Sequence, residues 1–198
     1  MRTIAKIGIS VLLFGLIVYF SGIAQADVKE ADGTFHLNEV GFLCGFGYGD
    51  DEINKTEDYE LIILSVRLGY DLASWLNWDI PGTLQVDFEP FVDPIMEPES
   101  NVEFGVAVLL KYAFPLTPRF WPYIEGGTGF IYSTQHTSQQ ATQWNFIDQG
   151  GVGISYLVND NTSVSLGYRF RHYSNLSIEE PNGGVDSQAV ICGISYLY

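Results

Sequence analysis

Residues 102–114 read VEFGVAVLLKYAF, and in this stretch large apolar side chains alternate with small or charged ones. Because successive side chains of a β-strand point to opposite faces, the alternation predicts a strand with two unlike faces. The first face consists of Val102, Phe104, Val106, Val108, Leu110, Tyr112 and Phe114. The second face consists of Glu103, Gly105, Ala107, Leu109, Lys111 and Ala113. Large apolar side chains thus fill one whole face of the predicted strand.

The same division recurs along the chain from about residue 36, and turn-forming stretches separate the repeats. Alternation over this length, bounded by Gly, Pro, Asn and Asp, is typical of antiparallel strands. Eight strands are predicted, at residues 36–49, 58–70, 82–93, 102–114, 120–133, 146–158, 162–175 and 186–198. The predicted fold class is therefore all-β.

The second face of the strands decides between a soluble sandwich and a membrane barrel. It is rich in glycine and carries isolated charges of both signs: Arg67, Asp87, Glu89, Glu103, Lys111, Glu125, Arg169 and Arg171. Small residues and balanced charges suit the crowded lumen of a narrow barrel whose outer face meets lipid. We predict an eight-stranded antiparallel transmembrane β-barrel of the bacterial outer membrane, with short periplasmic turns and long external loops.

The N-terminus has the pattern of a secretory signal. Arg2 and Lys6 precede an uncharged apolar run, and Ala24-Gln25-Ala26 follows it. We predict that residues 1–26 are cleaved and that residues 27–198 form a single barrel domain. An uncleaved anchor is the alternative, because the run is close in length to a membrane-spanning helix.

The chain is acidic, with a formal net charge of -15. Loss of the predicted leader, which has two basic residues and no acidic one, makes the charge -17. Nucleic acid is therefore not a predicted partner. The acidic stretches at residues 50–52, 57–58 and 179–180 are predicted to be solvated loops. A second interpretation is that they hold divalent cations that bridge to lipid phosphates. No cofactor is required by either interpretation.

Two cysteines, Cys44 and Cys192, fall on the apolar faces of the first and last predicted strands. They have no CxxC spacing and no clustered histidines, so no zinc site is predicted. If the barrel closes, these two strands are neighbours. A disulfide across the seam is one hypothesis, and two free apolar thiols are the alternative.

Polar residues with the chemistry of acyl transfer gather near the C-terminus. Continuing the alternation of the seventh strand places His172 and Ser174 on the lipid-facing side, at the loop end. In the eighth strand, Asp186 is an even number of residues before the apolar positions such as Val190, which places it on the same side. Ser174 has the hydroxyl of a nucleophile, His172 is a base, and Asp186 can orient the imidazole. Polar groups that face lipid are functional candidates by default.

Two donors for a reaction oxyanion are predicted directly after the serine. Asn175 carries a side-chain amide, and a backbone N–H near Leu176 or Ser177 is the other candidate. Residues 181–184, Pro-Asn-Gly-Gly, are predicted to form the turn that returns the chain to the eighth strand.

The sequence His172-Tyr173-Ser174-Asn175, the Pro-Asn-x-Gly loop at 181–184 and an acid twelve residues after the serine resemble the lipid A 3-O-deacylase (PagL-type) family. The resemblance implies an eight-stranded outer-membrane barrel whose outward Ser-His-Glu triad hydrolyses the 3-position acyl ester of lipid A. It also implies that lipopolysaccharide is the substrate and that the site faces the outer leaflet. The chain departs from the family in having Asp186 in place of glutamate and Ser177 in place of a glycine.

Three other questions stay open at the level of sequence. A non-enzymatic structural or adhesion barrel is the main functional alternative. A transporter of small apolar molecules is a weaker one, because eight strands enclose little space. The sequence also does not decide between a monomer and a homodimer.

Overall fold

The computed structural model describes residues 35–49, 58–136 and 140–198. The predicted leader at 1–26 and the acidic stretch at 50–52 lie outside the described residues, so both remain predictions. None of the helices in the described ranges is long and apolar enough to cross a membrane.

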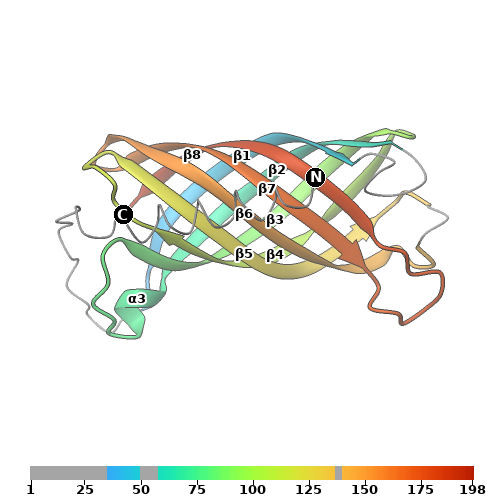
Figure 1. Ribbon diagram of the computed structural model, residues 1–198, viewed down its shortest axis with the longest axis horizontal. Coiled ribbons are helices and arrows are strands. Elements are labelled where there is room, and N and C mark those ends of the chain that lie inside the picture. Colours follow the sequence, from blue (N-terminus) through green and yellow to red (C-terminus); the bar gives the residue numbers. More distant parts are fainter. Residues whose placement is uncertain (1–34, 50–57, 137–139) are drawn as a thin grey trace, which may run out of the picture.

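Eight antiparallel strands form a closed barrel, which confirms the predicted fold class. The strands are β1 (Leu37–Gly49), β2 (Tyr59–Asp71), β3 (Thr83–Glu97), β4 (Asn101–Ala113), β5 (Phe120–Ser133), β6 (Trp144–Asn159), β7 (Thr162–Ser174) and β8 (Val185–Leu197). Each strand pairs with its neighbour in sequence, and β8 pairs with β1. Figure 1 shows the strands tilted along the long axis of the barrel, as closure of a sheet requires.

The outer surface of the barrel is apolar over its length, as the alternation predicted. Its strands expose large hydrophobic side chains, among them Phe42, Val66, Val92, Leu110, Ile124, Phe130, Leu166 and Ile194. Aromatic pairs lie toward both ends: Tyr132 packs on Trp144 with ring centroids 4.8 Å apart, and Tyr196 packs on Tyr198 at 5.0 Å. An apolar band between aromatic girdles is the surface that a membrane barrel presents to lipid.

The two ends of the barrel differ. The short helix α3 (Leu72–Trp75) and the end of β8 lie at one end, and the loop between β7 and β8 lies at the other (Figure 1). Asp71 caps α3, because the N–H of Ser74 donates to Asp71 Oδ1 at 2.9 Å. The sequence did not predict α3, since a helix of four residues is too short to show a periodic pattern.

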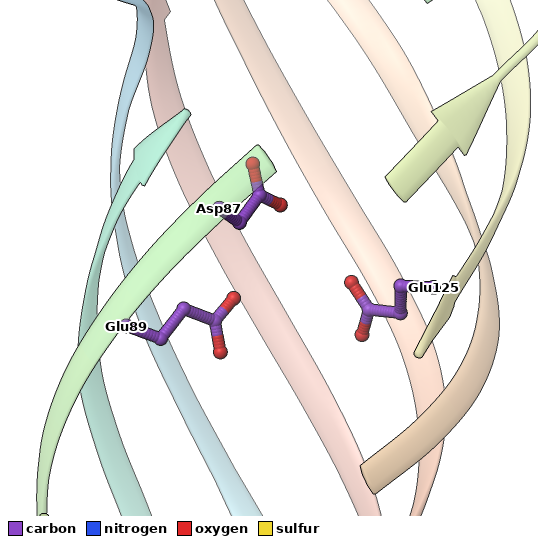
Figure 2. A group of neighbouring side chains, drawn as sticks. All are labelled: Asp87, Glu89 and Glu125. Atoms are coloured by element: carbon purple, nitrogen blue, oxygen red, sulfur yellow. The ribbon is translucent and has the colours of Figure 1, made fainter. Parts of the chain in front are cut away.

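Buried ion pairs fill the middle of the lumen. Figure 2 shows the carboxylates of Asp87, Glu89 and Glu125 directed into the barrel from β3 and β5. Between them, Arg67 Nη2 lies 2.6 Å from Glu89 Oε1 and 2.8 Å from Glu125 Oε2. Arg169 bridges the same two acids from β7, at 2.7 Å to Glu89 and 2.6 Å to Glu125. The two guanidinium groups therefore offset much of the charge of the three carboxylates and tie opposite walls of the barrel together.

A second set of buried pairs lies nearer the loop end. Arg171 Nη2 is 2.5 Å from Glu103 Oε1 and 3.1 Å from Asp93 Oδ2, and the hydroxyl of Tyr59 donates to Glu103. These contacts fix the inner side of β7 next to His172. Side chains that span the lumen in this way disfavour the transporter interpretation.

Removing one partner of the central cluster is expected to destabilise the barrel strongly. Arg67→Met leaves Glu89 and Glu125 with half of their cationic partners, and loss of one partner of a buried ion pair costs about 3–5 kcal/mol. We expect a drop of this order in the free energy of unfolding, measured by urea titration in detergent micelles. Arg119→Met, at an exposed turn, is the control and should unfold at the wild-type midpoint. An unchanged midpoint for Arg67→Met would contradict the proposed role of the cluster.

Closure of the barrel brings the two cysteines together, as predicted. Cys44 on β1 and Cys192 on β8 are register partners, and both are exposed on the outer face. Both thiols are free in the structure, which corresponds to the second of the two alternatives and not to the disulfide. Adjacent positions are not sufficient for a disulfide, since the bond also needs the two side chains to turn toward each other with a specific torsion.

Candidate active site

The site begins with a hydrogen bond between β7 and β8 on the outer surface of the barrel. His172 and Asp186 are directly opposite in the register of the two strands. The Nδ1–H of His172 donates to Asp186 Oδ1 at 2.6 Å, and the two side chains are 37% and 31% exposed. The shorter arm of aspartate therefore reaches the imidazole. This bond fixes the tautomer that leaves Nε2 free to accept a proton.

Ser174 lies two residues after His172, on the same face of β7. Tyr173 between them is buried, and both flanking side chains are partly exposed on the outside. Residues two apart on a strand are about 6.6–6.8 Å apart, which two side chains can span. The described residues include no hydrogen bond between Ser174 and His172. Such contacts often tighten only when substrate binds.

Gly184 leaves room for the imidazole. Its φ of +74° lies in the left-handed region, which glycine adopts without strain. A Cβ atom at this position would lie 2.6 Å from His172 Cε1. Gly184 therefore has two roles: it allows the left-handed backbone conformation before β8, and it leaves space for the imidazole of His172.

The chain after Ser174 turns sharply. Leu176 and Ser177 have φ values of 55° and 59°, and the N–H of Ile178 donates to the carbonyl of Asn175 at 3.2 Å. Within residues 140–198, the backbone N–H groups of Leu176 and Ser177 have no hydrogen-bond partner. Consecutive free N–H groups in a turn form a concavity that binds anions. These two N–H groups remain the predicted backbone donors to the oxyanion.

The side chain of Asn175 does not face the lipid side, so its predicted role as an oxyanion donor needs correction. It is 1% exposed, and its Nδ2 donates to the carbonyl of Glu179 at 2.8 Å. The backbone N–H of Asn175 donates to Asn182 Oδ1 at 2.8 Å. Asn175 follows Ser174 and therefore points to the opposite face, where it holds the loop in shape.

Asn182 is a site residue that the sequence analysis missed. Besides accepting from Asn175, its Nδ2 donates to Ser177 Oγ at 3.3 Å. It also forms an isolated β-bridge with Gln140, which joins the loop to the connection between β5 and β6. The Pro-Asn-Gly-Gly stretch was interpreted as a turn and as part of the family resemblance, and the sequence gives no signal for these contacts.

Asp148 on β6 is a second residue that was missed. It is exposed on the outer face and is the register partner of His172 on β7 and of Thr128 on β5. Together with Asp186, these residues form a polar row that crosses β5–β8 at one level of the barrel. The sequence does carry a signal for Asp148. It is an acidic residue at a position where the alternation of the predicted strand 146–158 calls for an apolar one.

At the next level of the same surface, β5 and β6 carry no side chains. Gly126 and Gly150 are register partners on β5 and β6. An added Cβ would meet only a backbone oxygen, at 3.5 Å for Gly126 and 4.0 Å for Gly150. Both glycines therefore face open space outside the barrel. They form a shallow strip next to Phe170, the β7 partner of Gly150.

The closed eight-stranded barrel, its apolar outer face and its aromatic ends define a small β-barrel of the outer-membrane class, with an outward acid–histidine pair beside a serine. A family model described as "Lipid A 3-O-deacylase (PagL)" matches residues 64–195. The match covers more than half of the chain. The chain belongs to the lipid A 3-O-deacylase (PagL) family.

One curated relative and two solved structures are similar to this chain. The chain is 26% identical over 192 residues to the lipid A deacylase PagL of Bordetella bronchiseptica, with 94% of both chains covered. The crystal structure of the outer membrane enzyme PagL matches with a TM-score of 0.54 and 20% identity, over 78% of this chain and 97% of that one. Neisserial surface protein A matches with a TM-score of 0.59 and 12% identity, over 82% and 97%. At these identities the two structures establish the fold alone.

Proposed function

We propose that this chain is a lipid A 3-O-deacylase, an esterase that hydrolyses the 3-position acyl ester of lipid A in the outer leaflet. Membership of the family supports the reaction and the substrate. The observation that carries the site assignment is the 2.6 Å hydrogen bond between His172 and Asp186 beside Ser174, on the face that meets lipid.

In the proposed reaction, Ser174 Oγ attacks the ester carbonyl carbon while His172 Nε2 takes the hydroxyl proton. The backbone N–H groups of Leu176 and Ser177 donate to the oxyanion of the tetrahedral intermediate. The bond between the carbonyl carbon and the sugar oxygen then breaks, and His172 gives its proton to that oxygen. A water molecule attacks the acyl-serine in the same way, which releases the fatty acid and restores Ser174.

The orientation of the site explains how a membrane lipid would reach it. A lipid A molecule in the outer leaflet has its sugars near the loops and its acyl chains along the barrel wall. An acyl chain attached near Ser174 would run toward the middle of the barrel past Asp148 and along the strip at Gly126 and Gly150. Substrate would enter laterally from the bilayer, so the reaction needs no internal cavity.

The proposed steps use no metal ion or organic cofactor. Glu179 and Glu180 lie in the loop above the site, and they remain predicted positions at which a divalent cation would bridge to the phosphates of lipid A. Glu180 Oε2 accepts from the N–H of Asn182 at 3.1 Å.

Purified refolded protein tests the proposal directly. We expect it to release one fatty acid from lipopolysaccharide in detergent micelles, with the lipid A product lacking the acyl chain at the 3-position. Mass spectrometry identifies the position, and gas chromatography quantifies the released acid. Intact lipid A, or loss of a chain from another position, would refute the proposal, and intact lipid A would favour a non-enzymatic barrel.

A further inference from the structure

A short segment between β2 and β3 projects sideways from the barrel. Figure 1 shows α3 outside the outline of the barrel wall, at the end where β8 finishes. Residues 72–78 are called the projecting segment below. Its large side chains are exposed, Trp75 by 51%, Leu76 by 38% and Trp78 by 54%. Large apolar side chains that gather on a surface in this way mark an interaction site.

The backbone of the projecting segment forms its hydrogen bonds internally. The N–H of Leu76 donates to the carbonyl of Leu72 at 3.0 Å. The N–H of Trp78 donates to the carbonyl of Ala73 at 2.9 Å, and Asn77 ends the helical turn with a left-handed φ of 54°. A backbone that satisfies its own polar groups enters apolar surroundings at little cost, because it gives up few hydrogen bonds to water.

Aromatic side chains connect the projecting segment to the lipid-facing wall. Phe88 is exposed on the outer face of β3 and packs edge-to-face with Tyr70, with ring centroids 5.8 Å apart. Phe35 stacks on Tyr70 at 4.9 Å and packs edge-to-face with Trp75 at 5.5 Å. The row of rings is therefore continuous from the barrel wall to α3. Since the wall meets lipid, the segment lies at the border of the same lipid.

The charges around the projecting segment indicate what kind of lipid surface it fits. Residues 71–82 include no Lys or Arg. Their two acids are Asp71, which is buried as the cap of α3, and the exposed Asp79. Attraction to anionic head groups depends on basic residues, which this stretch lacks. Tryptophan prefers the membrane interface because it combines an apolar ring with an N–H donor. The segment therefore fits head groups without net charge.

We infer that the projecting segment inserts Trp75, Leu76 and Trp78 among the head groups of the phospholipid leaflet on the periplasmic side. The end of the barrel that carries α3 is opposite the loop between β7 and β8, and the end opposite the long loops of an outer-membrane barrel faces the periplasm. The contact anchors one end of a rigid barrel and so fixes its depth in the membrane. This inference does not depend on the proposed deacylase function.

Fluorescence quenching by brominated lipids tests the inference. One variant keeps Trp78 as its single tryptophan and carries Trp75→Phe, Trp121→Phe and Trp144→Phe. It is refolded into vesicles of phosphatidylcholine, brominated either near the head group or near the end of the acyl chains. We expect the lipid brominated near the head group to quench most of the Trp78 emission and the other lipid to quench little. Acrylamide dissolved in the water should also quench little.

Trp121 provides the matched control, because it lies on the inner side of β5 and lines the lumen with Lys111. A variant with Trp121 as its single tryptophan should be quenched by neither brominated lipid. Strong quenching of Trp78 by acrylamide, with no effect of either lipid, would overturn the inference and leave the surface for a soluble partner. Dominant quenching by the lipid brominated near the chain end would also overturn it, because the segment would then lie in the hydrocarbon core.

A second variant changes the chain less and answers the same question if the single-tryptophan proteins fold poorly. Trp75→Phe combined with Trp78→Phe keeps the tryptophans at 121 and 144. The fraction of emission quenched by the lipid brominated near the head group should be smaller than in the wild type. An equal fraction would contradict insertion of the projecting segment. A normal shift in gel mobility on heating shows that the variant has folded.

Discussion

Ser174→Ala is expected to abolish deacylation, with kcat at least about 10⁴-fold below the wild-type value. The substitution removes the oxygen that forms the acyl-serine, and neither His172 nor the free N–H groups of the loop can replace it. The methyl group of alanine is tolerated on a lipid-facing strand, so the barrel should fold normally. The rate is measured as fatty acid released from lipopolysaccharide by purified protein.

Thr162→Ala provides a matched control for the loss of a hydroxyl. Thr162 begins the same strand, on the same face, at the opposite end of the barrel. This variant should retain wild-type activity. Both variants should show the shift in gel mobility on heating that marks a folded barrel. Activity of Ser174→Ala within tenfold of the wild type would exclude Ser174 as the nucleophile.

Asp186→Ala is expected to lower kcat by about 10²- to 10⁴-fold, the range for loss of the acid from a Ser-His-Asp arrangement. Asp186 accepts the Nδ1–H of His172 at 2.6 Å and would stabilise the imidazolium that forms when Ser174 loses its proton. Without this acceptor the imidazole is free to adopt the other tautomer. KM should change little, because Asp186 contacts the base and not the substrate.

Asp186→Glu separates the role of the charge from that of the arm length. The longer side chain keeps the carboxylate opposite His172 across the β7–β8 register, and activity should be preserved or raised. Asp186→Asn should behave like the alanine variant, because an amide does not stabilise the imidazolium as a carboxylate does. If Asp186→Ala keeps more than a tenth of the wild-type kcat, the 2.6 Å contact has no catalytic role.

The inner face of β7 explains why the outer face can hold a site in position. Arg169 and Arg171 alternate with Phe170 and His172, and each arginine is buried in ion pairs with strands across the lumen. The backbone that carries His172 and Ser174 is therefore anchored from inside at neighbouring positions. Catalytic side chains on a rigid element keep their spacing better than those on a loop.

The fold was predictable because its signal is local. Each strand shows its two faces through alternation, and the count of eight with charged inner positions such as Arg67 and Glu125 indicated a closed barrel before any pairing was known. The helix α3 was not predictable, because its four residues depend on the Asp71 cap. β3 extends to Glu97, beyond the predicted end at 93, because the alternation continues through Ile95.

The site was predictable only where strand parity determines the direction of a side chain. His172, Ser174 and Asp186 were assigned to one face in this way, and their side chains lie there. Asn175 was assigned a role from its residue type, and parity would have shown that it points away from lipid. The position of Asp148 opposite His172 depends on the register between two strands, and the contact of Asn182 with Ser177 depends on the conformation of the loop. The alternation within a single strand gives no information on either.

Lipid A mass spectrometry of Gram-negative cells that express this chain or its Ser174→Ala variant tests the central claim most directly. The claim is that an outward-facing serine on β7 removes the 3-position acyl chain of lipid A. It predicts that wild-type cells yield lipid A lighter by one acyl chain and that Ser174→Ala cells, with equal amounts of folded barrel in the outer membrane, yield intact lipid A. Intact lipid A in both strains, or the same loss in both, would contradict it.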